Sequence, residues 1–396
     1  NTAVGYNSLG ANTTANNNVA VGAYTLEDNS TGANNTAVGA GALKNNTTAS
    51  NNVGLGLDAL MTNTTGTLNT AVGAGAAQSN STGGAITAVG KDAGYSVTAD
   101  HNTLYGSGAG YTISTGTQNV IAGSNAGYYS NGSYNVAVGQ NALVGPSTGQ
   151  SGTHNTAVGY YALAANTTGG QNTAVGSNGL ISLTTGTGHT AVGYQAGMDV
   201  TTAVQGVFVG AQAGANVTTG NNNVLVGYGA GDAITTGTPN TAVGVGAYGN
   251  GNGSENVAIG NSVMALADSG SFYNTAVGST AGYDITTGDY NTLVGRYAGT
   301  SITGGSFNIC IGPSARPSAA TGESQTVIGY NVTGAGYATF AFGSGATVTS
   351  VGFGSTNWSG TSDERLKEDI KDEVVGLGFI NELRPVTFQW KKAKDV

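Results

Sequence analysis

A pentapeptide close to Asn-Thr-Ala-Val-Gly returns along most of this 396-residue chain at a nearly fixed interval. We call the glycine that ends each copy the anchor glycine. Of the 19 intervals between the 20 anchor glycines, 14 are 17 residues long, and the others are 16, 16, 20, 16 and 18. The anchor glycines are Gly5, Gly22, Gly39, Gly56, Gly73, Gly90, Gly106, Gly123, Gly139, Gly159, Gly176, Gly193, Gly210, Gly227, Gly244, Gly260, Gly278, Gly295, Gly312 and Gly329. Disorder does not require such a register, so the repeat predicts a solenoid with one coil per repeat.

The composition alone would also suit low-complexity disorder, because 69 residues are glycine and only 8% are charged. The fixed period argues against disorder. Seventeen residues are too few for two helices with their turns, but they suit two or three short strands joined by tight corners. We therefore predict an all-β fold, a parallel β-solenoid of about 20 coils over residues 1–343.

Each coil repeats the same few side chains around its anchor glycine. Val, Ile or Leu precedes the anchor in 18 of 20 coils, and Asn lies four residues before it in 16 of 20. We expect the aliphatic row (Val4, Val21) to point inward and the asparagine row (Asn1, Asn18) to form a ladder at a corner. Alanine two before the anchor, as in Ala20, should then face outward. Because such a core is thin, we predict a parallel homotrimer with this alanine stripe at its interface.

Charge divides the chain near residue 362. Residues 362–396 carry 8 acidic and 7 basic side chains, which leaves 12 acidic and 4 basic ones for residues 1–361. The formal net charge of −9 argues against nucleic-acid binding, and no 18-residue apolar run suggests insertion into a membrane. One cysteine, Cys310, and three scattered histidines, His101, His154 and His189, predict no metal centre, and no motif indicates a cofactor.

The Asn-Thr-Ala-Val-Gly repeat, with its small residues and asparagine corners, resembles the head repeats of trimeric autotransporter adhesins. The resemblance implies a trimer of left-handed β-rolls. After Gly329 the interval shortens to 14 and then 11 residues, at Gly343 and Gly354. We therefore predict a cap or neck over residues 344–361, since terminal repeats of a solenoid are commonly atypical.

The last 35 residues carry a different motif. Ser-Asp-x-x-Leu-Lys from Ser362 to Lys367, followed by Leu-Arg-Pro-Val-x-Phe-x-Trp-Lys, resembles the start of the intramolecular chaperone domain of phage endosialidases, tailspikes and tail fibres. In that family the chaperone trimerises, directs folding of the fibre and then cuts itself off beside the serine. The resemblance implies that Ser362 and Lys367 perform a single-turnover autoproteolysis, and no turnover enzyme is expected. Alternatively, Ser362 caps a helix whose dipole Asp363 and Glu364 complement.

Together these features predict a structural fibre, a phage or prophage tail fibre in the virion tail or the extracellular space, which attaches to a glycan or protein receptor on the host surface. A bacterial cell-surface adhesin or secreted filament is the alternative. An ice-binding solenoid is a third, with rows of threonine such as Thr13 and Thr14. Tyrosines recur just after the anchor and five residues after it, as either structural stacks or sugar-binding platforms. The 20-residue coil adds a loop at residues 145–150 that is a candidate contact site.

Overall fold

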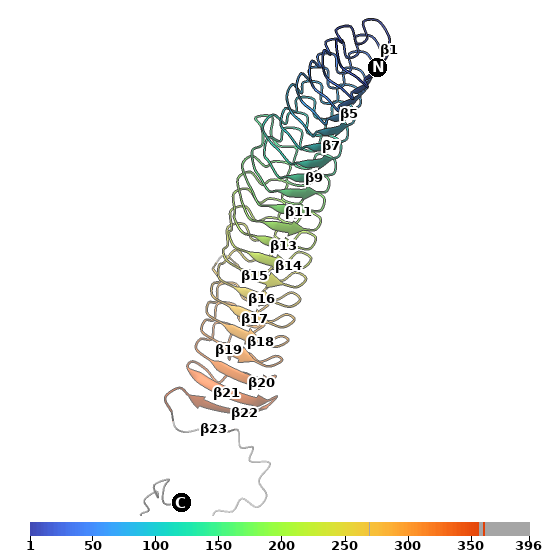
Figure 1. The fold of residues 1–396 in the computed structure, drawn as a ribbon. Helices are drawn as coiled ribbons and strands as arrows, with labels where there is room; N and C mark the ends of the chain where they lie inside the picture. The colour runs from blue at the N-terminus through green and yellow to red at the C-terminus, as the bar shows by residue number, and fades with distance from the viewer. Residues whose placement is uncertain (269, 356–358, 361–396) are drawn as a thin grey trace, which may run out of the picture.

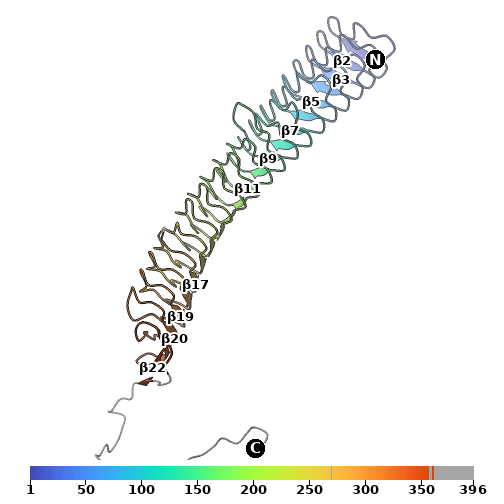
Figure 2. The same cartoon turned by 90° about the vertical axis from the view of Figure 1, so that its left-hand side faces the viewer.

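The computed structural model describes residues 1–268, 270–355 and 359–360. Figure 1 shows the coils stacked end to end in an elongated rod. Each coil contributes one short strand, and consecutive strands pair in parallel with equivalent residues opposite each other, for example Ala20 with Ala37. The strands lie above one another along one side of the rod (Figures 1 and 2). The predicted parallel β-solenoid of about 20 coils is therefore confirmed.

The strands are β1 (Thr2–Val4), β2 (Val19–Val21), β3 (Thr36–Val38), β4 (Val53–Leu55), β5 (Thr70–Val72), β6 (Thr87–Val89), β7 (Thr103–Tyr105), β8 (Val120–Ala122), β9 (Val136–Val138), β10 (Thr156–Val158), β11 (Thr173–Val175), β12 (Thr190–Val192), β13 (Val207–Val209), β14 (Val224–Val226), β15 (Thr241–Val243), β16 (Val257–Ile259), β17 (Thr275–Val277), β18 (Thr292–Val294), β19 (Ile309–Ile311), β20 (Thr326–Tyr330), β21 (Thr339–Ser344), β22 (Thr347–Gly352) and β23 (Ser359–Gly360). The parallel pairing continues as far as β21, after which β22 and β23 pair antiparallel. The solenoid thus ends in a hairpin, within which the predicted cap or neck at residues 344–361 begins.

The prediction of two or three strands per coil is wrong, because each coil forms one. The rest of a coil passes through tight turns with left-handed backbone, such as Tyr24 (φ 57°), Leu26 (φ 51°) and Asn34 (φ 61°). Residues with positive φ cannot continue an extended strand. Hydrogen bonds between coils persist there, and the Leu26 amide donates to the Ala42 carbonyl at 3.1 Å. The coils are therefore joined around much of their circumference.

The anchor glycines lie at a close contact between successive coils. Their φ angles lie between 120° and 144°, where side-chain-bearing residues are strained. A Cβ on Gly56 would lie 2.4 Å from the carbonyl oxygen of Gly73, the next anchor. The expectation that the corner glycines need positive φ is confirmed, and the close approach of the two backbones is a second reason for glycine.

The predicted faces of the strand are reversed. The strand centres of β2 to β20 are buried, as Ala20 and Ala37 show, whereas Val38 is 39% exposed. The prediction that neighbouring residues of the strand point to opposite sides was correct. In a three-residue strand, however, either the central residue or the two flanking residues can point inward. Leucines of the turns, such as Leu26 and Leu43, fill the interior and leave room for only a methyl group at the centre of the strand. The alanine stripe therefore cannot be the interface of a trimer.

The core volume is shared between two positions of the coil. Where the turn carries a leucine four residues after the anchor, the strand centre is alanine or, at Gly54, glycine. Where the turn carries glycine, the strand centre is often large, as at Phe208. A Cβ on Gly197 would lie 2.8 Å from Cδ2 of Phe208, and one on Gly214 would lie 2.6 Å from Cδ1. Large strand centres therefore occupy the space that the glycines leave open.

Two asparagine ladders run along the interior corners. In the predicted one, the Asn35 amide N–H donates to Oδ1 of Asn18 at 2.9 Å, and Nδ2 of Asn18 donates to the Gly32 carbonyl at 2.8 Å. The second ladder is confined to the first coils, from Asn12 to Asn80, and links side chains directly, as where Nδ2 of Asn46 donates to Oδ1 of Asn29 at 2.8 Å. Both satisfy buried polar groups that would otherwise destabilise the core.

Candidate functional site

The outward side of the strands forms a surface without charged residues along the rod. We call it the outer sheet face and define it as the first and third residues of β1 to β20, which flank the buried strand centres. Every one of these residues is Thr, Val, Ile, Leu, Tyr or Ala, so none is charged. Tyr105 is 49% exposed, Val120 46% and Ile311 39%. With strands about 4.8 Å apart, the face runs for roughly 90 Å.

A monomeric protein seldom exposes a continuous apolar patch of more than a few hundred Å². The two outward residues of one strand lie about 7 Å apart. Taken as a flat strip of that width along the rod, the outer sheet face covers roughly 600 Å². Sequence reasoning missed this face because it placed the valines inside. The available signal was the exchange of alanine for Leu, Ile or Phe at the strand centre, which marks that position as core.

The predicted cleavage residues Ser362 and Lys367 lie outside the described residues. The structure therefore does not place them relative to one another or to the rod.

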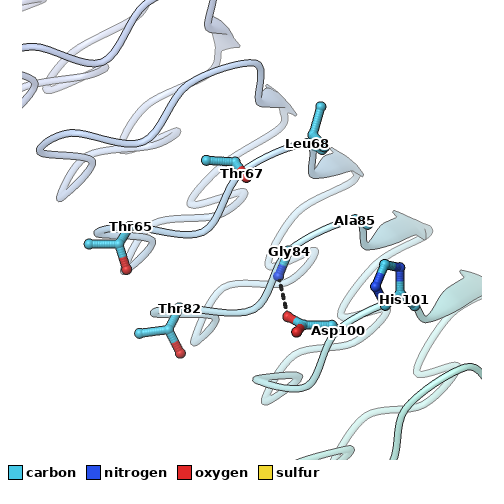
Figure 3. Close-up of a pocket in the computed structure, with 8 residues that line it drawn as sticks. All are labelled: Thr65, Thr67, Leu68, Thr82, Gly84, Ala85, Asp100 and His101. Carbon is cyan, nitrogen blue, oxygen red and sulfur yellow. Dashed lines mark hydrogen bonds between the residues drawn. The ribbon is translucent and has the colours of Figure 1, made fainter.

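A trough of about 280 Å³ opens at the corner that carries Asp100 and His101. Figure 3 shows the Asp100 carboxylate turned toward the backbone of Gly84, whose N–H donates to Oδ1 at 2.7 Å. Equivalent contacts occur along the rod, since Asp289 Oδ1 accepts from the amide of Phe272 at 2.7 Å. Asp100 therefore joins coils rather than serving as a free catalytic group.

The three histidines lie in separate surroundings. His101 is exposed. The ring of His154 stacks on Tyr134, with centroids 4.8 Å apart. His189 is buried in the first asparagine ladder. In the part of the chain that the structure describes, no group of three or more His, Cys, Asp or Glu side chains could hold a metal ion.

His189 replaces an asparagine of the ladder. Its Nε2 lies 2.6 Å from the Ala203 carbonyl oxygen, and its Nδ1 accepts from the Gly206 amide at 3.0 Å. These contacts fix a neutral ring with the proton on Nε2. Burial lowers the pKa of His189, although the two backbone hydrogen bonds oppose that effect. The residue is thus a structural equivalent of asparagine.

Cys310 lies at the buried centre of β19, where most coils have alanine. Burial raises the pKa of its thiol to about 12. A thiol of this kind is a poor nucleophile, so Cys310 acts as a small packed side chain.

The threonine rows have divided roles. The first threonine of a pair uses its hydroxyl to bond the next coil, and Oγ1 of Thr13 donates to the Ser30 carbonyl at 2.9 Å. Oγ1 of Thr64 donates likewise to the Ser81 carbonyl at 3.0 Å. The hydroxyls of these first threonines are thus engaged between coils, which reduces the array that an ice-binding surface would need.

Aromatic side chains stack in short columns. Tyr95, Tyr111 and Tyr128 lie five residues after successive anchors, with ring centroids 4.9 and 4.6 Å apart and planes within 4° of parallel. A second column, which sequence reasoning missed, joins Tyr273, Tyr290 and Phe307 at 4.7 and 5.0 Å. The three members of this column each lie five residues before an anchor glycine. The structural interpretation of the tyrosine rows therefore holds within the columns.

The extra loop at residues 145–150 leaves the rod directly after Val144. Its tip is exposed, and the Gly149 amide donates to the Pro146 carbonyl at 2.9 Å. The chain returns at Gln150, whose buried side chain accepts from Oγ of Ser130 at 2.7 Å. The loop is thus an outward excursion that leaves the core register intact.

Comparison with known proteins identifies the carboxy-terminal segment. Residues 362–395 match the family described as chaperone of endosialidase. No curated protein and no solved structure matches the chain. The described residues include no helix that is long and apolar enough to cross a membrane. The chain therefore joins a β-solenoid rod to a chaperone-type segment.

Proposed function

We propose that this chain is the shaft of a homotrimeric fibre, a phage or prophage tail fibre of the virion tail that attaches to the host surface through a glycan or protein receptor. The observation that carries the proposal is the order of its parts, a long rod followed directly by a segment similar to the chaperone of endosialidase. A rod that displays exposed side chains along its whole length is suited to surface attachment. Purified fibres should therefore bind host cells.

The trimer is proposed to form through the outer sheet face, with two further copies of the chain as its occupants. The face is apolar or threonine along its whole length, and identical parallel chains would place like residues side by side. No charge opposes their approach, because none of its residues is ionisable apart from Tyr105. Burying it would supply the apolar contact that the interior of one coil provides only thinly.

The chaperone segment answers a problem that the repeat creates. Parallel chains of nearly identical coils can shift by 17 residues with little loss of contact. Pairing between distant segments is also slow. A clamp at the carboxy terminus would set the stagger before the coils associate, and cleavage afterwards would leave the fibre kinetically trapped.

Charged substitutions on the outer sheet face test the trimer. The wild-type chain should sediment at three times the mass of one chain, and Val226→Lys combined with Val243→Lys should convert it to monomer by burying six like charges in two adjacent coils. The matched control is Ser147→Lys with Thr148→Lys, which adds the same charge at the exposed loop and should leave the trimer intact. A monomeric wild-type shaft, or a trimer that tolerates the face substitutions, would contradict the proposal.

The proposed cleavage uses Ser362 as nucleophile and Lys367 as the base that accepts its proton. In the full-length gene product, Ser362→Ala and Lys367→Ala should each abolish a discrete cleavage product, as seen by gel electrophoresis and intact mass. Ser359→Ala and Lys371→Ala are matched controls and should still be cut. Unchanged cleavage in either test variant would rule out the pair.

A further inference from the structure

The column of Tyr95, Tyr111 and Tyr128 ends at an unfilled position. Successive rings lie one coil apart, but the next coil carries Val144 at the equivalent place, five residues after its anchor. A hollow of about 370 Å³ opens there, lined by Asn125, Tyr128, Tyr129, Asn141 and Val144. It lies where a further ring of the stack would stand, at the foot of the inserted loop.

The two aromatic rings of the hollow offer different surfaces. Tyr129 stands nearly perpendicular to Tyr128, at 69° with centroids 4.7 Å apart. An aromatic ring attracts C–H groups over its face and presents its own positive edge to acceptors. Val144 supplies a further apolar wall. The lining therefore favours a ligand with a ring-shaped apolar face.

Two side-chain amides complete the hollow. Asn125 (φ 53°) and Asn141 (φ 56°) hold equivalent positions in neighbouring coils. Within the described part of the chain, their side chains make no hydrogen bond, unlike the asparagines of the two ladders. Each amide can donate two hydrogen bonds and accept two, which suits neighbouring hydroxyl groups. No ionisable side chain other than tyrosine lines the hollow.

We infer that this hollow binds one neutral pyranose ring, with an apolar sugar face against Tyr128 and Tyr129 and hydroxyls on the amides of Asn125 and Asn141. The sugar ring takes the place that a fourth aromatic ring would hold in the column. The inference deepens the proposed attachment role and rests on it, since it names the chemical class of the receptor. A volume near the lower end of the usual 300–1,000 Å³ for ligand pockets suits a single ring.

The test measures binding of methyl glycosides of glucose, galactose, mannose and N-acetylglucosamine to the full chain by saturation-transfer NMR. The wild-type chain should bind at least one of them. Val144→Tyr should extend the column into the hollow and weaken binding at least tenfold. Tyr128→Ala should do the same by removing the platform. Asn141→Gly, which keeps the left-handed backbone, should weaken binding about threefold or more.

Tyr290→Ala is the matched control, because it removes a ring from the other column and should leave binding within twofold of wild type. Circular dichroism of each variant checks the fold. If the wild type binds none of the four glycosides, if Val144→Tyr binds as tightly as wild type, or if Tyr290→Ala weakens binding equally, the inference is overturned. Adhesion of the fibre to host cells is a separate readout, so attachment that survives Val144→Tyr would overturn the sugar site without overturning the attachment role.

Discussion

Replacing Phe208 with alanine is expected to lower the free energy of unfolding of the middle coils by about 3–5 kcal/mol. The ring is fully buried between Gly197 and Gly214. Gly206 faces it too, since a Cβ there would lie 2.4 Å from Cζ of Phe208. Three glycines have no side chains that could move into the space, so the cavity would persist. Urea denaturation, with hydrogen exchange of β12, β13 and β14 to locate the effect, measures the loss.

A compensating variant tests whether Phe208 stabilises the rod through the volume that its ring fills. Gly197→Leu and Gly214→Leu added to Phe208→Ala would convert these coils to the leucine type, and should recover much of the lost stability. Leucine tolerates the required backbone, because Leu180 has φ 49° at the equivalent position and both glycines have φ 59°. Gly214→Leu alone should destabilise, because its Cβ meets the ring. If the triple variant is no more stable than Phe208→Ala, the inference that the strand centre and the turn share the core volume is contradicted.

Gly176→Ala is expected to destabilise the rod by about 3–5 kcal/mol, from positive-φ strain and overpacking together. Gly176 has φ 139°, and a Cβ there would lie 2.2 Å from the carbonyl oxygen of Gly193. Neither atom belongs to a flexible side chain, so the coils must separate. The same denaturation measurement should show early loss of protection in β11 and β12.

Gly179→Ala is the matched control three residues away. Its backbone has no positive φ, and the nearest atoms to a new Cβ lie at 3.6 Å, an ordinary contact. Alanine already holds this position in other coils, for example Ala42. The substitution should be neutral or stabilise by about 0.4–1 kcal/mol, since alanine restricts the unfolded chain. If Gly176→Ala and Gly179→Ala destabilise the rod equally, the close approach of the coils at Gly176 is not the cause.

The period of the sequence was enough to predict the solenoid, its number of coils and the glycine corners. Which residues of each strand point into the core was not predictable from the period. In a three-residue strand, Ala20 and Val21 alternate correctly whichever of them is inside, so alternation does not choose between the faces. The choice depends on Leu26 and its equivalents, which adopt a left-handed backbone that leucine propensity does not indicate.

The candidate sugar site was likewise predictable only in part from the sequence. The spacing of Tyr95, Tyr111 and Tyr128 identified a row of tyrosines, and the long coil identified the inserted loop. The amides of Asn125 and Asn141 carried no signal, because asparagine is frequent throughout the repeat. Only the folded rod distinguishes asparagines that are bonded in a ladder from those left free at a surface.

The 17-residue period alone predicts that this chain winds into about 20 stacked coils with glycine at each corner, because a backbone that returns every 17 residues must meet its own copy at the same points. The motif that begins at Ser362 likewise predicts that a chaperone-type segment follows the rod. Which side of the strands is core becomes clear only from the folded coil. The reason is steric: the volume inside a coil is shared between strand and turn, so the place of each side chain depends on what fills the rest of the coil.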